Sequence, residues 1–598
     1  MNVKENHNGT EDFFSPIDKH FARFMCNLQG TQADEFFYAA ALASKAGTEG
    51  HVCVDLHDIP GTLLTDRTLH QLPSPDTWPK LLKQYETVGT PGDFKPLILD
   101  GSRLYLYRFW IAERRIADIL IQKAEHNPIP SSQPLSPLLD QLFEAGDRLI
   151  WQKTAAISAA SRSLCVVTGG PGTGKTTTAA NILQVLITLS APTSLRIACA
   201  APTGKAANRL RESLHKAAAA NVPSLSLPTE ATTIHRLLGA GAGGFRYTSE
   251  NPVPADVIVV DEASMIDITL IHQLLEAISP ECRLILLGDR FQLASVEPGA
   301  VLGDLCPDRE VGRFTPEFAE FVSQIAGLEI PSDQSAHPLS DCLIELRTVF
   351  RFNENIARVS EQVRNGNPEE VVKIISNDES KRVCLLDFSD HLDTTRTFVE
   401  TVLPFYESLF EAPTVEALFE SLERFRILCA LRNGPSGVYA INAAIEKLLY
   451  QRKLIHGDSL WYEGKPVMIT RNDYNLNLFN GDIGVITRKL TGEESAVFAT
   501  SKGEYRAISP SRLPSHETAY AMTIHKSQGS EFDHVMLVLP PQESPVLTRE
   551  LLYTGITRAK SRVDVVGSED VLRSVVSKSI ERTTGLRQKL WGETKGSR

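Results

Sequence analysis

The sequence predicts an α/β protein with two parallel-sheet domains in tandem, a small β-barrel inserted in the second, and a mainly helical N-terminal domain. Apolar segments typical of strands alternate with helices between about residues 145 and 305, at 164–168, 195–200, 257–261 and 284–288. The same alternation returns at 426–431, 534–539 and 562–566. Continuous apolar strands that alternate with helices indicate parallel sheets covered on both faces. The length of 598 residues also requires several domains, because single cores rarely grow beyond about 300 residues.

The order of features along the chain predicts where the domains begin and end. Residues 1–125 carry no chemical motif and form the N-terminal domain, and the proline-rich stretch 127–134 is typical of a linker. The first α/β domain then covers 126–345, and the second is divided into 346–460 and 516–598. Between these two parts, 461–515 combines short strands with turn dipeptides, which predicts a small β-barrel.

An apolar helix at 105–120 carries the aromatic residues of the N-terminal domain. Its side chains Tyr105, Tyr107, Phe109 and Trp110 fit packing into a core, and they also fit a surface on which a partner docks. The sequence leaves both interpretations open.

Composition and charge are those of an ordinary soluble protein. Hydrophobic residues make up 42% and charged residues 22% of the chain, and no apolar run approaches the ~20 residues of a membrane-spanning helix. The nine cysteines are scattered without a C-x-x-C pair, which predicts reduced, buried thiols in a cytoplasmic protein rather than a metal site. The net charge of −12 does not exclude nucleic acid, because binding depends on local clusters of Lys and Arg.

A glycine-rich loop between the first strand and the following helix predicts a phosphate-binding site. Glycines let backbone N–H groups converge on phosphate oxygens, and the helix N-terminus adds positive charge. Lys175 is expected to neutralise the β- and γ-phosphates, and the Thr176 hydroxyl to ligate Mg²⁺. The chain is therefore expected to bind and hydrolyse ATP through Gly169, Gly170, Pro171, Gly172, Thr173, Gly174, Lys175, Thr176 and Thr177.

Polar residues after two further strands complete the predicted catalytic set. Asp261 and Glu262 end a buried strand, where Asp261 can hold Mg²⁺ through water and Glu262 can polarise the attacking water. Asp261 could instead be a helix N-cap. Gln292 follows the next strand, where its amide can bind a terminal phosphate and report hydrolysis; taken alone, it would be a surface turn residue.

Gln152, just before the first strand, has an amide that can read the adenine edge with paired donor and acceptor bonds. This signal is weak by itself, since glutamine is common on surfaces.

These motifs together resemble superfamily 1 helicases, in the 1B group. The stretch 349–352 resembles the fourth helicase motif, which implies that Arg351 touches the γ-phosphate. The stretch 523–532 resembles the fifth, which links strand contacts to the nucleotide and implies a nucleotide contact at Glu531. The stretch 553–560 resembles the sixth, which implies that Arg558 is an arginine finger. Hydrolysis would then depend on closure of the two domains.

Nucleic-acid contacts are expected on the opposite lip of the cleft. The loop after the second strand begins a helix, so its N–H groups and side chains can hold backbone phosphates. His235 belongs to a second contact loop, although it could equally be a packed core histidine. Such phosphate contacts are independent of base sequence, as a translocating motor requires. The predicted contacts are Pro202, Thr203, Lys205, His235, Thr523, His525 and Lys526.

The residues of these motifs are similar to those of the RecD family, the α chain of the bacterial RecBCD (exodeoxyribonuclease V) complex. The resemblance is carried by 169–178, 260–267 and 552–560, together with 39–42 and 50–53 in the N-terminal domain. It covers nearly the whole chain and implies RecA-like domains, an SH3-like insertion and a 5′→3′ motor on single- and double-stranded DNA. It also implies docking through the N-terminal domain on a RecC-like chain, next to a RecB-like chain, for unwinding and degrading DNA from double-strand ends.

Two other functions remain open at this point. One is a stand-alone RecD-like or conjugative-type helicase, although the resemblance implies that stand-alone members usually have a longer N-terminal extension than the 168 residues that precede the phosphate loop here. The other is a scaffold whose ATP site only switches an interface. Glu463-Gly464-Lys465 has the E-x-K spacing of some nucleases, but such tripeptides often arise by chance, and the resemblance assigns the nuclease to the RecB chain.

Overall fold

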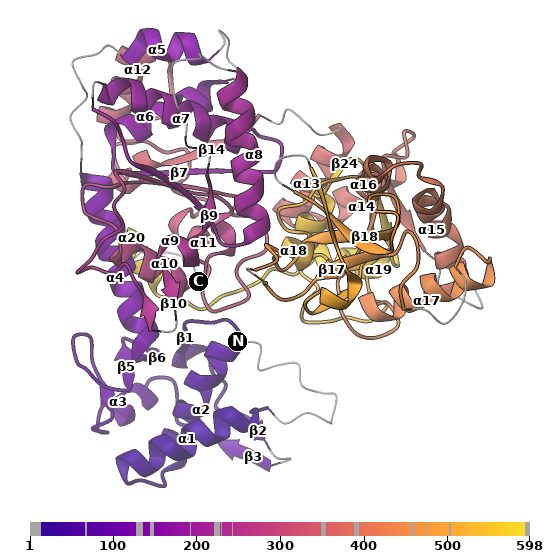
Figure 1. The fold of residues 1–598 in the computed structure, drawn as a ribbon. Helices are drawn as coiled ribbons and strands as arrows, with labels where there is room; N and C mark the ends of the chain where they lie inside the picture. Colours follow the sequence, from indigo (N-terminus) through magenta and orange to yellow (C-terminus); the bar gives the residue numbers. More distant parts are fainter. Residues whose placement is uncertain are drawn as a thin grey trace.

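The computed structural model shows an N-terminal lobe attached to two α/β domains that lie side by side (Figure 1). Within the part of the chain that it describes, no helix has both the length and the apolar composition needed to cross a membrane. All nine cysteines fall in that part as free thiols, and each of them except Cys384 is buried. The described residues are 13–65, 68–126, 135–143, 149–191, 193–220, 228, 230–241, 243–348, 354–387, 394–455, 460–473, 475–500 and 504–592.

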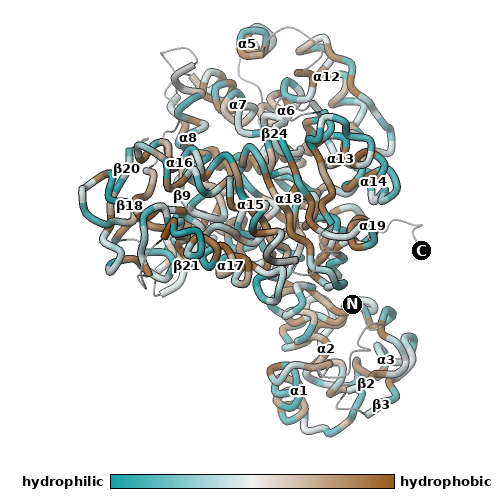
Figure 2. The backbone as a smooth tube through the Cα atoms, turned by 90° about the vertical axis from the view of Figure 1, so that its right-hand side faces the viewer, coloured by the Kyte–Doolittle hydropathy of each residue, from teal (hydrophilic) through white to brown (hydrophobic). Residues whose placement is uncertain are grey.

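The N-terminal lobe packs two helices against a mixed sheet. Ser15 begins the first helix with a capping box, in which its side chain and that of Asp18 each accept a backbone N–H. Beside its helices, the lobe contains a sheet of order β1-β6-β5-β4 and a separate β2-β3 hairpin. Figure 2 shows the lobe projecting from the rest of the molecule. Its elements are α1 (Pro16–Gln29), α2 (Asp34–Thr48), β1 (Cys53–Asp55), β2 (Thr62–Thr65), β3 (Thr68–Gln71), α3 (Trp78–Leu82), β4 (Val88–Gly89), β5 (Leu97–Asp100) and β6 (Arg103–Leu106).

Two elements pack across the predicted domain limits. Helix α4 (Tyr107–Glu125) leaves the lobe and runs along the first α/β domain (Figure 1), where Phe109 and Trp110 enter the same core as the strands of its sheet. The core interpretation of these aromatic residues is therefore confirmed. The C-terminal helix α20 (Leu586–Trp591) packs on α4 and on the first domain, although it follows the second domain in sequence. The division at residues 125 and 516 otherwise remains a prediction.

The first α/β domain is built on a wholly parallel sheet of order β14-β7-β13-β12-β8-β9. Its strands are apolar on both faces because helices cover both sides. All four strands predicted from the sequence lie in this sheet. The elements are α5 (Leu135–Leu142), α6 (Ile150–Ser161), β7 (Leu164–Gly169), α7 (Lys175–Ser190), β8 (Ile197–Ala201), α8 (Gly204–Ala220), β9 (Thr232–Thr233), α9 (Ile234–Leu237), β10 (Ala240–Gly241), β11 (Gly244–Phe245), β12 (Val257–Val260), α10 (Ile268–Glu276), β13 (Arg283–Gly288), α11 (Val301–Leu305), α12 (Pro316–Ala326) and β14 (Leu343–Leu346).

The second α/β domain repeats this plan with a parallel sheet of order β15-β24-β23-β16-β22. The strands predicted at 426–431, 534–539 and 562–566 are β16, β23 and β24. The elements are α13 (Glu354–Asn365), α14 (Pro368–Ser376), β15 (Val383–Leu386), α15 (Thr394–Glu411), α16 (Val415–Arg424), β16 (Phe425–Cys429), α17 (Val438–Gln451), β22 (Ala521–Thr523), β23 (Phe532–Val538), α18 (Arg549–Ile556), β24 (Ala559–Val566) and α19 (Glu569–Ser577).

The insertion is an antiparallel sheet of order β20-β19-β18-β17-β21 with a small core of its own. Its last strand, β21 (His516–Thr518), extends past the predicted limit at residue 515. Four short strands precede it: β17 (Pro466–Ile469), β18 (Ile483–Thr487), β19 (Ser495–Ala499) and β20 (Tyr505–Ile508). Because β21 leads directly into β22, the insertion lies next to the first strand that follows it in the second domain.

Candidate nucleotide site and nucleic-acid path

The glycine loop joins the end of β7 to the start of α7, as the sequence predicts. Gly172 and Gly174 have φ of 76° and 85°, the left-handed region in which glycine is strongly favoured. The Thr173 hydroxyl donates to the Gly170 carbonyl at 2.8 Å and tightens the turn. The Lys175 ammonium donates to the Gly169 and Gly170 carbonyls at 2.7 and 3.1 Å, so it lies across the loop where phosphate oxygens would attract it.

The two carboxylates after β12 lie at the same edge of the sheet. Glu262 has a φ of 53°, and a non-glycine residue in the left-handed region is a strained backbone feature that clusters at functional sites. Asp261 accepts the Glu262 N–H at 2.8 Å. Burial and the charge of Glu262 raise the pKa of Asp261 to about 7, against the opposing charges of Lys175 and Arg209. The N-cap interpretation of Asp261 is wrong, because Asp267 caps the following helix α10.

Gln152 lies on α6 with its side chain only 4% exposed. Both its amide nitrogen and its amide oxygen lack a hydrogen-bond partner among the described residues. An unpaired buried amide is costly, so this donor and acceptor pair suits a ligand edge that offers the complementary groups.

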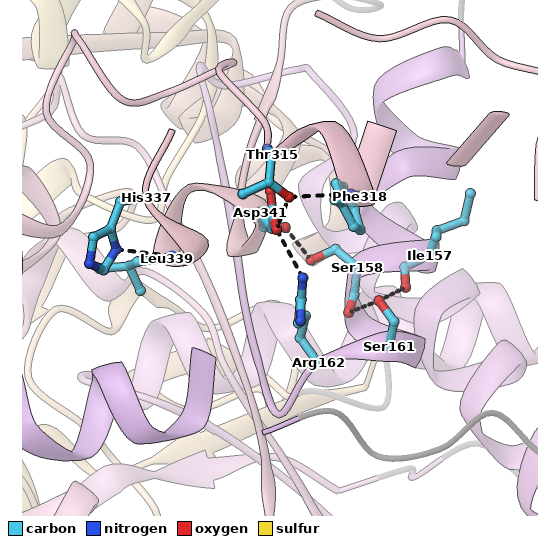
Figure 3. Close-up of polar contacts among 9 residues, drawn as sticks. All are labelled: Ile157, Ser158, Ser161, Arg162, Thr315, Phe318, His337, Leu339 and Asp341. Carbon is cyan, nitrogen blue, oxygen red and sulfur yellow. Dashed lines mark hydrogen bonds and ion pairs between the residues drawn. The ribbon is translucent and has the colours of Figure 1, made fainter. Parts of the chain in front are cut away.

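A buried acid fixes the helix that carries Gln152 (Figure 3). Asp341 accepts hydrogen bonds from Arg162 Nη2 at 2.9 Å and from the Thr315 N–H and hydroxyl at 2.9 and 2.8 Å. Its own carbonyl accepts the Ser158 hydroxyl at 2.9 Å. Since Ser158 belongs to α6 and Arg162 follows it directly, the network ties the end of this helix to the segment before β14 and to the start of α12.

The second domain contacts the first, next to the glycine loop, through α18 and the residues that follow it. Arg558 is 2% exposed and donates to the carbonyls of Thr554 and Ser530 at 3.1 and 3.3 Å. Thr554 in turn accepts the Leu293 N–H at 3.0 Å, which joins the two domains. Arg351 lies outside the described residues, so its predicted role stays a prediction.

Charged residues of both domains gather around Arg209, near Glu262. Burial lowers the pKa of Arg209 on α8, with Glu531 and Glu262 opposing this shift and Arg558 adding to it. Glu262 also faces Gly529, since its Oε1 lies 3.9 Å from the position that a Cβ on this glycine would take. The predicted residues Glu262, Glu531 and Arg558 are therefore brought together by the fold.

A cavity of about 550 Å³ opens between the glycine loop and α13. It is lined by Gly170, Thr173 and Tyr553, and by two arginines of α13, Arg358 and Arg364. Neither arginine is among the predicted site residues. Their signal was weak, because they follow the fourth motif on an amphipathic helix where exposed arginines are ordinary.

The predicted nucleic-acid loops meet at the carboxyl ends of β8 and β9. The register pairs Ala201 with Thr233, which puts the loop that begins at Pro202 next to the segment with His235. The Thr203 hydroxyl accepts the Ala206 N–H at 3.2 Å and so caps the start of α8. His235 is exposed next to Phe245, with ring centroids 6.0 Å apart, so its core interpretation is wrong.

The insertion contacts Lys526 and the Gly204–Lys205 turn among the predicted DNA contacts. The Lys526 ammonium donates to Glu517 on β21 at 2.9 Å, and the Thr523 hydroxyl accepts the Lys526 N–H at 3.3 Å.

The start of α8 also packs on the insertion. A Cβ added to Gly204 would lie 2.8 Å from Cγ of Phe479. Burial, with the charge of Arg209, lowers the pKa of Lys205 to about 7, although Asp482 of the insertion opposes this shift. Burial also lowers the pKa of His525, the residue before Lys526.

The structure also bears on two alternatives from the sequence, a surface position for Gln292 and the E-x-K tripeptide. Gln292 is 6% exposed, so it is not a surface turn residue. Glu463 accepts hydrogen bonds from Thr487 and Lys489 of the insertion, and Lys465 pairs with Glu446 on α17 at 3.0 Å. The two charged residues of the E-x-K tripeptide therefore have structural partners. Among the described residues, no group of three or more His, Cys, Asp and Glu side chains is placed to hold a metal ion.

Family models match four parts of the chain. These are the RecBCD enzyme subunit RecD N-terminal domain at 10–105, an AAA domain at 152–298, the ATP-dependent RecD-like DNA helicase SH3 domain at 441–499, and the UvrD-like helicase C-terminal domain at 518–566.

Whole-chain relatives agree with these matches. The chain is 37% identical over 600 residues to the RecBCD enzyme subunit RecD of Mycolicibacterium smegmatis, covering 97% of this chain and 98% of the relative. It is 35% identical over 529 residues to the subunit of the same name from Haemophilus influenzae, covering 82% and 80%. It is 28% identical over 464 residues to the ATP-dependent RecD2 DNA helicase of Deinococcus radiodurans, but covers only 52% of that longer protein.

Proposed function

This chain belongs to the RecD family of RecBCD enzyme subunits and is an ATP-dependent DNA helicase, and we propose that it works as the 5′→3′ motor of an exodeoxyribonuclease V complex. Together with RecB-like and RecC-like chains in the cytoplasm, it unwinds DNA from double-strand ends for degradation and recombinational repair. The likeness to RecBCD subunits over nearly the full length supports this assignment, as does the match to the N-terminal domain model.

One arrangement carries the motor proposal: groups from two separate parallel-sheet domains meet around one cavity. Gly170 and Thr173 come from the first domain, whereas Tyr553 and Thr557 come from the second. The buried Arg558 of the second domain also lies near Arg209 of the first. A scaffold that only switches an interface would not require a buried arginine delivered from the opposite domain. Hydrolysis that depends on both domains couples the chemistry to their relative movement.

The donor set fits ATP and Mg²⁺. The half-buried Asp261 carboxylate has a raised pKa, and a divalent cation next to it would offset the cost of its charge. The Thr176 hydroxyl at the start of α7 and Asp261 would hold the ion, which would neutralise phosphate charge.

The other side chains act on the nucleotide directly. Lys175 binds the phosphates, Glu262 accepts the proton of the attacking water, and Arg558 stabilises the charge that develops on the γ-phosphoryl group. The Gln152 amide binds the adenine edge, and Glu531 supports the nucleotide from the second domain.

We propose that nucleic acid binds along both α/β domains. The contacts of the first domain are Pro202, Thr203, Lys205 and His235, and those of the second are Thr523, His525 and Lys526. Both sets include cationic side chains, and Thr203 caps a helix, which suits phosphate contacts that do not depend on base sequence. Salt should weaken binding strongly, because neutralised phosphates release counterions.

The N-terminal lobe is the docking element for the RecC-like chain. Helix α1 exposes a stripe of apolar side chains, with Ile17 65%, Phe24 61% and Leu28 54% exposed. Large exposed apolar side chains in a stripe mark interaction sites. Removal of residues 1–125 would be a poor test, since α4 belongs to the core of the first domain.

The test is expression of the full chain alone and together with candidate RecB and RecC chains. Unwinding of DNA tailed at either the 5′ or the 3′ end then reports direction, and Lys175→Ala reports the site. We expect DNA-stimulated ATPase to be lost in Lys175→Ala with the complex still assembled, and unwinding to require a 5′ tail. Unchanged ATPase in Lys175→Ala would refute the nucleotide site, and unwinding only from 3′ tails would refute the direction.

The alternative is a stand-alone RecD-like or conjugative-type 5′→3′ helicase. The likeness to the Deinococcus radiodurans helicase keeps this alternative open. Full unwinding activity by the chain alone, with no RecB or RecC partner recovered on co-expression, would favour it.

A further inference from the structure

A tyrosine of the second domain bonds directly to a buried acid of the first. The Tyr553 hydroxyl donates to Asp289 Oδ2 at 3.0 Å. Tyr553 lies on α18 and is 5% exposed, whereas Asp289 follows β13 and is 1% exposed. A hydrogen bond from a hydroxyl to a buried carboxylate is stronger than one in water, because the surroundings screen it less.

The same carboxylate holds the predicted phosphate sensor. Gln292 Nε2 donates to Asp289 Oδ2 at 3.2 Å, and the Phe291 N–H donates to Oδ1 at 3.0 Å. The Gln292 Oε1 atom lacks a partner among the described residues. With its nitrogen held by Asp289, the amide is left with a free acceptor whose direction is fixed by the carboxylate.

The tyrosine also touches the glycine loop. A Cβ added to Gly170 would lie 3.1 Å from the Tyr553 hydroxyl, closer than ordinary van der Waals contact. Tyr553 and Gly170 both line the cavity of about 550 Å³ between the two domains. The hydroxyl therefore sits where the loop, the sensor and the second domain meet.

Neighbouring bonds show that this edge of the two domains is closed. The Leu293 N–H donates to the Thr554 hydroxyl at 3.0 Å, and Gln528 Nε2 donates to the Leu293 carbonyl at 3.4 Å. Because Tyr553, Thr554 and Gln528 all belong to the second domain, separation of the two domains would break their bonds to the loop at 289–293.

We propose that Tyr553 is a positioning residue, which on domain closure orients the Gln292 amide for ATP hydrolysis by holding Asp289. It makes no bond to nucleotide and acts through the acid. The inference rests on the proposed ATP-driven function and deepens it, since it names the contact through which the second domain fixes the orientation of the Gln292 amide.

The test uses the full chain and single-strand-stimulated ATPase. Tyr553→Phe removes only the hydroxyl, and we expect kcat to fall about tenfold, which corresponds to about 1.4 kcal/mol, while KM for ATP changes less than about twofold. The matched control is Tyr406→Phe, which removes another buried hydroxyl of the second domain that bonds to the Tyr520 carbonyl away from the cleft. This control should keep both kcat and KM.

A second pair of variants separates positioning from simple support of the fold. If Tyr553 acts through the sensor, Tyr553→Phe should cause no further loss of kcat in a Gln292→Ala background. A loss of the same factor in both backgrounds would overturn the proposal, and so would an unchanged kcat or a rise in KM alone. Asp289→Asn should reproduce the kcat loss of Tyr553→Phe, so the proposal remains testable if one variant folds poorly. Absence of ATPase in the unmodified chain would refute the proposed function instead.

Discussion

Replacement of Arg558 tests the dependence of hydrolysis on the second domain most directly. The guanidinium is 2% exposed and is held by the Thr554 and Ser530 carbonyls of its own domain, so it is fixed before nucleotide arrives. Arginine fingers contribute about 10³–10⁵ in rate, which is about 4–7 kcal/mol of barrier. The hydrogen bonds lost from Arg558→Ala should lower stability by about 1–3 kcal/mol, less than the effect on the barrier.

The assay compares turnover at saturating ATP and single-stranded DNA with the affinity for a fluorescent ATP analogue. We expect Arg558→Ala to lower kcat at least about a thousandfold and to change nucleotide affinity less than about tenfold. Arg558→Lys keeps the charge without the fork of donors and should recover only part of the rate. Arg426→Lys is the matched control, because Arg426 is also buried in the second domain and donates to the Ala519 and Leu422 carbonyls. Equal losses of binding and turnover in Arg558→Ala would contradict the finger role.

Four further outcomes are expected. Glu517→Gln releases Lys526, so affinity for single-stranded DNA should rise about two- to fivefold, the size of a partly exposed ion pair; weaker binding would contradict a DNA role for Lys526. Because the pKa of Lys205 is lowered to about 7, binding should take up a proton and weaken as pH rises above 7, and Lys205→Arg, which stays charged, should abolish this dependence. Asp341→Ala leaves buried donors unpaired, so urea denaturation should show a loss of about 3–5 kcal/mol together with a higher KM for ATP; a stable variant would argue against the anchor. Phe24→Asp should reduce co-purification with RecC and leave ATPase intact, and undiminished recovery of the complex would exclude α1 as the docking face.

The strands of both α/β domains and the order of the nucleotide motifs could be predicted because their signals are local. An apolar run before a glycine loop specifies β7 and the start of α7 without reference to the rest of the chain. The position of Gln292 after its strand also follows from local order, but the partner that orients it, Tyr553, lies more than 260 residues away in sequence. No periodicity records such a contact.

Packing between distant segments accounts for the other differences. Helix α4 has the apolar pattern of any buried helix, so the sequence cannot tell that its core belongs to the next domain rather than to the lobe. The C-terminal segment is polar, yet Arg582 donates to the Gly50 carbonyl and Thr583 N–H donates to His51 at 2.9 Å. These bonds use backbone groups, which carry no signal in the side-chain pattern.

The geometry of α8 explains how one helix can serve both ligands. Strands β8 and β12 are neighbours in the sheet, with Ala200 paired to Val260, so the loop before α8 and the carboxylates after β12 share one edge. Lys205 and Arg209 are four residues apart and therefore lie on the same face of the helix. Lys205 lies near Asp482 of the insertion, and Arg209 lies near Glu262 and Glu531. If Lys205 binds DNA as proposed, we expect a shift of α8 to move Arg209 relative to Glu262, the proposed base, because the two cationic residues are one helical turn apart.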